Sequence, residues 1–80
     1  MSRVLIEAFL FDDINEAKII AHKLSIRRVA QVLENMHIIV PNRKRRRARY
    51  LLIGKDNGGA FITVPIEPTS DREVWRPITA

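Results

Sequence analysis

The spacing of apolar residues changes once along this chain, near Met36, and the change limits the folds available to it. Before Met36, apolar residues recur three and four positions apart, as in helices. After it, short apolar runs are separated by turn residues, as in strands. Helices grouped before a run of strands are typical of an α+β domain. We therefore predict an N-terminal strand, a two-helix hairpin and an antiparallel β-meander, with the helices packed on one face of the sheet.

The first helix is expected to follow an apolar strand at residues 4–11. Asp12 or Asp13 can cap its start, and a cap at Asp13 would place Glu16 at the third helical position, as in a capping box. The residues at helical spacing, which we predict to form its apolar face, are Ile14, Ala17, Ala21 and Leu24.

Ser25 offers a cap for a second helix, and Asn35 is expected to stop it. The link between the two helices is so short that they must form a sharp hairpin. The predicted apolar stripe of the second helix is Ile26, Val29, Val32, Leu33 and Met36. The residues expected to face solvent are Arg27, Arg28, Gln31 and Glu34.

The strands are bounded by turn residues. "HIIVP" is a short strand whose Pro41 marks its end or an edge position. Residues 47–54 are expected to form the next strand, and "AFITVPI" its return. Between them lies the turn "KDNGG", where Asn57 and Gly58 tolerate positive φ. "VWRPITA" is the last strand, and its proline suggests an edge that a partner's segment can extend.

A basic run, "NRKRRRAR", precedes the strand at residues 47–54 and holds Arg43, Lys44, Arg45, Arg46, Arg47 and Arg49. Lys and Arg total 14 against nine Asp and Glu, which gives a net charge of +5. Without the six basic residues the rest would carry +5 − 6 = −1, so the positive charge is local. Such a patch favours phosphate, which arginine grips with two parallel hydrogen bonds. A solvated loop and a nuclear localisation signal are the alternatives.

Composition excludes several classes of site. Eighty residues make one small domain, and the absence of cysteine rules out disulfides and cysteine-bound zinc. His22 and His37 lie too far apart in sequence to indicate a metal site. The apolar runs are far shorter than the roughly 20 residues that a bilayer requires, and the N-terminus does not resemble a secretory signal. We expect a cytoplasmic protein without a cofactor or metal.

Three segments together resemble one family, the BrnT-type toxins of the RelE-like class. "NEAKIIAHKLS" is similar to the family's first helix and its Lys-His-Gly-like end, with Lys23 in place of the usual glycine. "RARYLLIGKDNGGAFITVPIEP" resembles the central hairpin, and "EVWRPITA" resembles the last strand. The resemblance covers about residues 12–80. It implies a single RelE-like domain over residues 1–80 that lacks the C-terminal helix usual in the family.

The resemblance also implies a function. BrnT-type toxins are small basic endoribonucleases that cut RNA and arrest translation. Each is neutralised by a cognate antitoxin, and the complex contacts DNA only through that antitoxin. His22 matches the family's helix histidine, Arg49 and Arg47 match basic positions at the start of the central strand, and Arg76 matches the arginine of the last strand.

Metal-independent RNA cleavage needs an acid, a base and cations around the phosphate. Histidine suits the first two roles near neutral pH, and Arg and Lys stabilise the charged transition state. The candidate catalytic residues are His22, Arg49, Arg76 and Lys18, and the residues at 43–47 are candidates for binding nucleic acid. Glu7 or Glu67 is a possible auxiliary base. We hypothesise that these groups converge where the first helix crosses the sheet.

Each candidate also has a structural interpretation. A histidine at a helix end often bonds a backbone carbonyl, and Lys18 is typical of a solvent-facing lysine. We expect His37 to be structural, Trp75 to be a core anchor, and Tyr50 to lie in the core with its hydroxyl at the edge. The alternative function is a non-catalytic module that binds nucleic acid, or docks an antitoxin, through the same basic patch.

Overall fold

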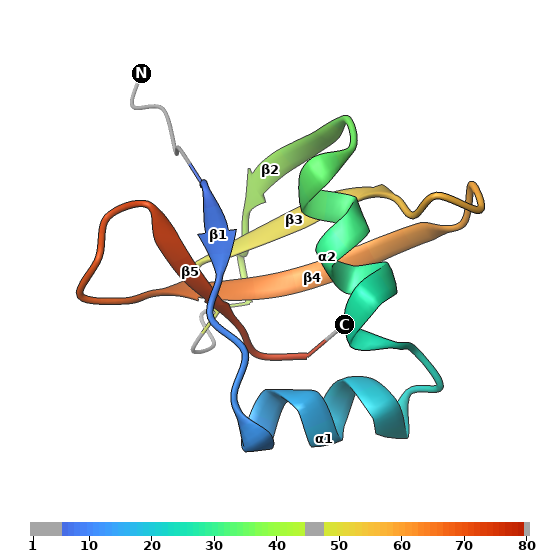
Figure 1. Ribbon diagram of the computed structural model, residues 1–80. Coiled ribbons are helices and arrows are strands. Elements are labelled where there is room, and N and C mark those ends of the chain that lie inside the picture. The colour runs from blue at the N-terminus through green and yellow to red at the C-terminus, as the bar shows by residue number, and fades with distance from the viewer. Residues whose placement is uncertain (1–5, 45–47, 80) are drawn as a thin grey trace.

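The computed structural model describes residues 6–44 and 48–79. It contains two helices and five strands in the order β1, α1, α2, β2, β3, β4, β5 (Figure 1). The bounds are β1 Ala8–Phe9, α1 Asp13–Ala21, α2 Ile26–Glu34, β2 His37–Pro41, β3 Tyr50–Lys55, β4 Phe61–Pro68 and β5 Val74–Pro77. The predicted α+β class is confirmed.

The five strands form one mixed sheet in the order β1-β5-β4-β3-β2. Strands β2 to β5 make the predicted antiparallel meander, whereas β1 runs parallel to β5, with Ala8 opposite Val74. The expected N-terminal strand is much shorter than residues 4–11, and the part before residue 6 lies outside the described residues. β2, which ends at Pro41, is an edge strand, as its proline suggested.

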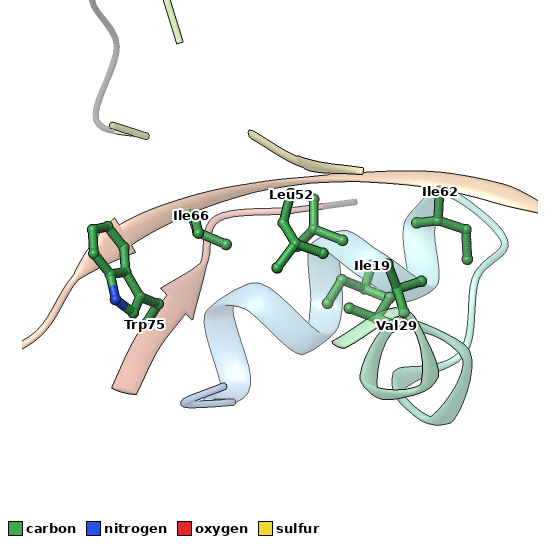
Figure 2. Close-up of a cluster of buried hydrophobic side chains, with 8 residues drawn as sticks. Ile19, Val29, Leu52, Ile62, Ile66 and Trp75 are labelled. Carbon is green, nitrogen blue, oxygen red and sulfur yellow. The ribbon is translucent and has the colours of Figure 1, made fainter. Parts of the chain in front are cut away.

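Both helices cover one face of the sheet (Figures 1 and 2). The core joins Ile19 and Val29 of the helices to Leu52, Ile66 and other residues of the sheet, each fully buried. Because side chains alternate along a strand, the neighbouring residues point to the other face, which no helix covers among the described residues. Neither helix of the described chain is long and apolar enough to cross a membrane.

The start of α1 differs in detail from the prediction. Asp12, not Asp13, is the cap: its Oδ1 accepts from the Asn15 backbone N at 2.9 Å, and Asn15 Oδ1 accepts from the Asp12 N at 2.9 Å. The buried face of α1 therefore holds Asn15 and Ile19. The predicted face was wrong, and Ile14 is 62% exposed. The pattern missed this face because a polar residue, bonded to two backbone carbonyls, occupies its centre.

Helix α2 begins and ends as predicted. Ser25 Oγ accepts from the Arg28 N at 3.1 Å, and Asn35 is the C-cap. Met36 is 95% exposed, because the helix has already ended and the chain bends toward β2. Two of the residues expected to face solvent instead hold the β3–β4 hairpin. Arg28 Nε bonds Asp56 Oδ2 at 2.7 Å, and Gln31 Oε1 accepts from the Asn57 N at 3.0 Å.

Among the described residues, the backbone is left-handed at two turn positions. Gly59, with φ of 88°, supplies the positive φ of the β3–β4 hairpin, where Asn57 and Gly58 had been expected to do so. The other is Lys23, with φ of 63°, directly after the α1 C-cap His22. Glycine is the usual residue at this place after a helix, because a side chain there meets the backbone. Lys23 is therefore strained by the sharp turn between the two helices.

Replacing Lys23 with glycine should stabilise the fold. We expect Lys23→Gly to raise the free energy of unfolding by about 0.5–1 kcal/mol, because relief of left-handed strain exceeds the added freedom of the unfolded chain. Urea unfolding followed by circular dichroism measures the change. Lys18→Gly, in the last turn of α1, is the matched control, and it should lower the free energy of unfolding by about 1 kcal/mol. An equal loss in both variants would contradict the role given to Lys23.

Candidate nucleic-acid interface

Arg76 is held between two carboxylates. It lies on β5, directly across from Glu67 of β4. Its Nη1 donates to Glu67 Oε1 at 2.9 Å, and its Nε and Nη2 donate to the two oxygens of Asp12 at 2.6 and 3.1 Å. The Arg76 side chain is only 13% exposed. These three residues, which we call the Arg76 clamp, join the start of α1 to the two strands.

The electrostatics of the Arg76 clamp disfavour phosphate. The hydrogen bonds from Arg76, followed by that from the Asn15 backbone, lower the pKa of Asp12 from 3.8 to about 2. The bond with Asp12 correspondingly raises the pKa of Arg76. With two ionised carboxylates against one guanidinium, the clamp carries a formal charge of +1 − 2 = −1. An incoming phosphate would meet net negative charge and find three of the five N–H donors of Arg76 engaged.

The strand that carries Arg76 is not at the edge that Pro77 suggested. β5 lies between β1 and β4, so the sequence prediction of an edge position was wrong. The Asn15 side chain donates to the carbonyl oxygens of Leu10 and Pro77, at 3.0 and 2.9 Å. The segment that leads into α1 thus covers the outer side of β5. Proline is tolerated there because the main-chain pairing with β1 has ended two residues earlier, at Trp75.

His22 and Lys18 lie together at the other end of α1. His22 is the C-cap and Lys18 precedes it by one turn, and both side chains are exposed. His22 Nδ1 lies 3.2 Å from Thr79 Oγ1 near the end of the chain. His22 follows Asp12 by ten residues, so the helix separates them by about 15 Å. The structure therefore does not bring the His22 imidazole to the Arg76 guanidinium.

The basic run lies between β2 and β3. Arg43 and Lys44 are exposed in a turn after Pro41, and Arg49 is exposed immediately before β3, which begins at Tyr50 rather than at residue 47. The predicted residues Arg45, Arg46 and Arg47 lie outside the described residues. We call the segment at residues 42–49 the basic loop.

Backbone contacts fix both ends of the basic loop. The Asn42 N donates to the Arg49 O at 3.0 Å, and the Asn42 side chain donates to the Ala48 O at 2.9 Å. The Arg49 N in turn donates to the Ile66 O at 2.9 Å, so the loop is joined to β4. These bonds hold exposed cations at a defined place on the sheet while their side chains stay in water.

A cavity beside the basic loop escaped the sequence analysis. It measures about 550 Å³ and lies on the uncovered face of the sheet. Its lining comes from the loop, two strands and the segment after β5: Asn42, Lys44, Ala48, Leu51, Pro65, Ile78 and Thr79. These residues meet only through strand register, which no short motif records. One of these residues, Thr79, also has its Oγ1 3.2 Å from His22 Nδ1 at the end of α1.

The remaining candidates have structural surroundings. His37 Nδ1 lies 2.8 Å from the Asn35 O, and Trp75 is in the core with its ring 5.4 Å from that of Tyr50. Of the two proposed auxiliary bases, Glu67 belongs to the Arg76 clamp, and Glu7 hydrogen-bonds Glu73 and raises its pKa. Within residues 6–44 and 48–79, no three acidic or histidine side chains are grouped to hold a metal ion.

The Arg76 clamp predicts how stability depends on pH. The folded-state pKa of Asp12 lies below its ordinary value, so its contribution is present above pH 3.8 and is lost as the pH falls toward 2. We expect the free energy of unfolding, measured in urea, to fall across this window. Asp12→Asn keeps a good helix cap but removes the charge, so its stability should fall less steeply. A slope unchanged by Asp12→Asn would contradict the ion pair.

Asp56 provides the matched comparison. Its pKa is also lowered, first by the hydrogen bond from Arg28 and then by that from the Ala60 backbone. Asp56 therefore contributes to the stability that the unaltered protein loses at acid pH. Asp56→Asn should flatten the curve independently, and the effects of the two substitutions should add.

The chain was also compared with known proteins. No protein-family model, no curated protein and no solved structure matches it. The resemblance to the BrnT-type toxins therefore rests on the motifs quoted from the sequence.

Proposed function

We propose that this chain binds single-stranded RNA through the basic loop. The observation that carries the proposal is the contrast between two sets of cations. Arg43, Lys44 and Arg49 are exposed on a segment whose ends are fixed, whereas Arg76 is engaged by two carboxylates. Exposed guanidinium and ammonium groups on a fixed loop suit a phosphate backbone. RNA is the ligand that the resemblance to the BrnT-type toxins implies.

Two features of the fold support the proposed relationship to the BrnT-type, RelE-like toxins. The helices pack on one face of an antiparallel meander, as expected for that class. In addition, Lys23 adopts the left-handed conformation at the position where the family usually has glycine. Glycine is favoured at this position because the sharp turn after α1 requires a left-handed backbone conformation.

Neutralising the described part of the basic loop should weaken RNA binding. We expect Arg43→Gln, Lys44→Gln and Arg49→Gln together to lower affinity for a fluorescein-labelled 12-nucleotide oligouridylate, measured by fluorescence anisotropy. Each phosphate contact on a single strand contributes about 0.7 to the slope of log K against log salt. The slope should therefore fall by roughly 2 if each residue holds one phosphate.

The control removes the same charge elsewhere. Arg27→Gln, Lys55→Gln and Arg72→Gln replace three other exposed cations, and each triple variant has a net charge of +5 − 3 = +2. If both triple variants lost affinity equally, binding would depend on net charge alone, and the assignment to the basic loop would be wrong.

A second candidate function is RNA cleavage, as in the toxins that the sequence resembles. His22 and Lys18 are exposed together, and Thr79 links His22 to the cavity beside the basic loop. In this proposal the imidazole removes the 2′-hydroxyl proton, the oxygen attacks the adjacent phosphorus, the bond from phosphorus to the 5′-oxygen breaks, and the 5′-oxygen takes a proton from water. Lys18 stabilises the charged transition state. A cognate antitoxin would bind the same cations and block RNA, and would supply any contact with DNA.

Cleavage should depend on His22 and not on His37. We expect His22→Ala to slow cleavage of a labelled RNA by about 10²–10⁴-fold, the usual contribution of a general acid or base, with RNA affinity unchanged. His37→Ala is the matched control. Arg76→Ala is not a clean test, because it leaves Asp12 and Glu67 without their cation. If no cleavage products formed, or if expression caused no growth arrest, the proposal of a nuclease would be wrong and the proposal of RNA binding would stand.

A further inference from the structure

We propose that the 550 Å³ cavity beside the basic loop is a binding site for one unstacked nucleobase of single-stranded RNA. The inference rests on the proposed function and deepens it, because it assigns a base-binding site to a protein so far argued to hold only phosphates. The cavity has the size and the mixture of apolar lining and few polar groups that small-ligand sites usually show.

The floor of the cavity is apolar. Leu51 of β3 lies directly opposite Pro65 of β4, and the Ile78 N donates to the Pro65 O at 2.8 Å on the other side. The three residues thus form one row across adjacent strands, about 10 Å wide at 4.8 Å per strand. Their neighbours Leu52 and Ile66 are buried beneath the helices, so by alternation this row points to the uncovered face. A planar ring can lie on such a surface.

Pro65 lies where the pairing of β4 with β5 ends. The N and O of one strand residue point to the same side, so the Pro65 N faces Ile78, beyond the end of β5 at Pro77, and no ladder hydrogen bond is lost. The pyrrolidine ring puts a rigid apolar surface in the middle of the floor, and its carbonyl still accepts from Ile78.

The charges at one end of the floor would orient a nucleotide. The basic loop supplies Lys44 and Asn42 to the wall, and Ala48, which is 5% exposed, leaves room because its side chain is small. At the same end of the floor, but over β4 and β5, lies the Arg76 clamp: Glu67 follows Pro65 and Arg76 precedes Ile78 by two residues, about 7 Å along the strands. Its excess negative charge repels phosphate. The phosphate should therefore stay on the basic loop while the base covers Pro65.

The charges favour RNA over a second copy of this chain as the occupant. Lys44 lines the cavity, and Arg43 and Arg49 are exposed on the same basic loop. A second copy docked over the same cavity would bring another such loop near the first and would meet like-charge repulsion. A single-stranded polyanion that carries bases gains both charge pairing and apolar contact.

An abasic oligonucleotide separates base binding from phosphate binding. The 12-nucleotide oligouridylate and an abasic strand of the same length carry equal phosphate charge, and their affinities for the full chain are compared by fluorescence anisotropy. We expect the uridylate to bind at least about fivefold more tightly, the lower end of the effect of one base contact. Pro65→Thr and, separately, Ile78→Ala should remove most of this difference and leave the salt dependence unchanged.

The variants are chosen so that the fold survives. Threonine restores a backbone donor at position 65 and suits a strand, and Thr63 already occupies the same face of β4. Ile53→Thr is the matched control, because Ile53 lies on the same face of β3 but lines a different cavity. It should keep the preference for the uridylate. Circular dichroism confirms folding of each variant.

The outcomes are distinct. Equal binding of the two strands, with steep salt dependence, would overturn the base site and leave the proposed function standing. Binding of neither strand would overturn both. If light scattering showed a dimer that Pro65→Thr dissociates, while the preference for the uridylate persisted, the floor would be a self-association surface and the inference would be wrong.

Discussion

The Arg76 clamp is the interaction on which the rest of the structure depends. One guanidinium, on an inner strand, bonds the carboxylate that caps α1 and the carboxylate across β4. The cap residue also forms the reciprocal box with Asn15, whose side chain reaches the carbonyls of Leu10 and Pro77. In a chain of 80 residues, whose core is small, such a connected polar group fixes how the first helix sits on the sheet.

The clamp also divides the cations of the protein into two kinds. Arg76 is matched by carboxylates and serves the fold, whereas the basic loop presents its charges to solvent from ends that are hydrogen-bonded in place. Both lie beyond the same end of the apolar row, the basic loop over β2 and β3 and the clamp over β4 and β5, so this end of the uncovered face is positive over one pair of strands and negative over the other. This polarity, rather than net charge, is the physical basis for proposing an oriented single strand of RNA there.

Local patterns predicted the elements of the fold well and the site poorly. The caps Ser25 and Asn35 and the order of the meander follow from residue type and spacing. The buried face of α1 was mispredicted because Asn15, a polar residue, is its centre. Arg76 was assigned to phosphate because its carboxylate partners are 64 and nine residues away, at separations that no motif records. The cavity was missed for the same reason, since only strand register brings Pro65 and Ile78 to the loop.

A crystal structure with a short single-stranded RNA is the most direct test of this account. We predict phosphate oxygens within hydrogen-bonding distance of Arg43, Lys44 or Arg49, while Arg76 keeps its bonds to Asp12 and Glu67. A phosphate bound by Arg76, with either carboxylate displaced, would contradict the central claim that this arginine serves the fold.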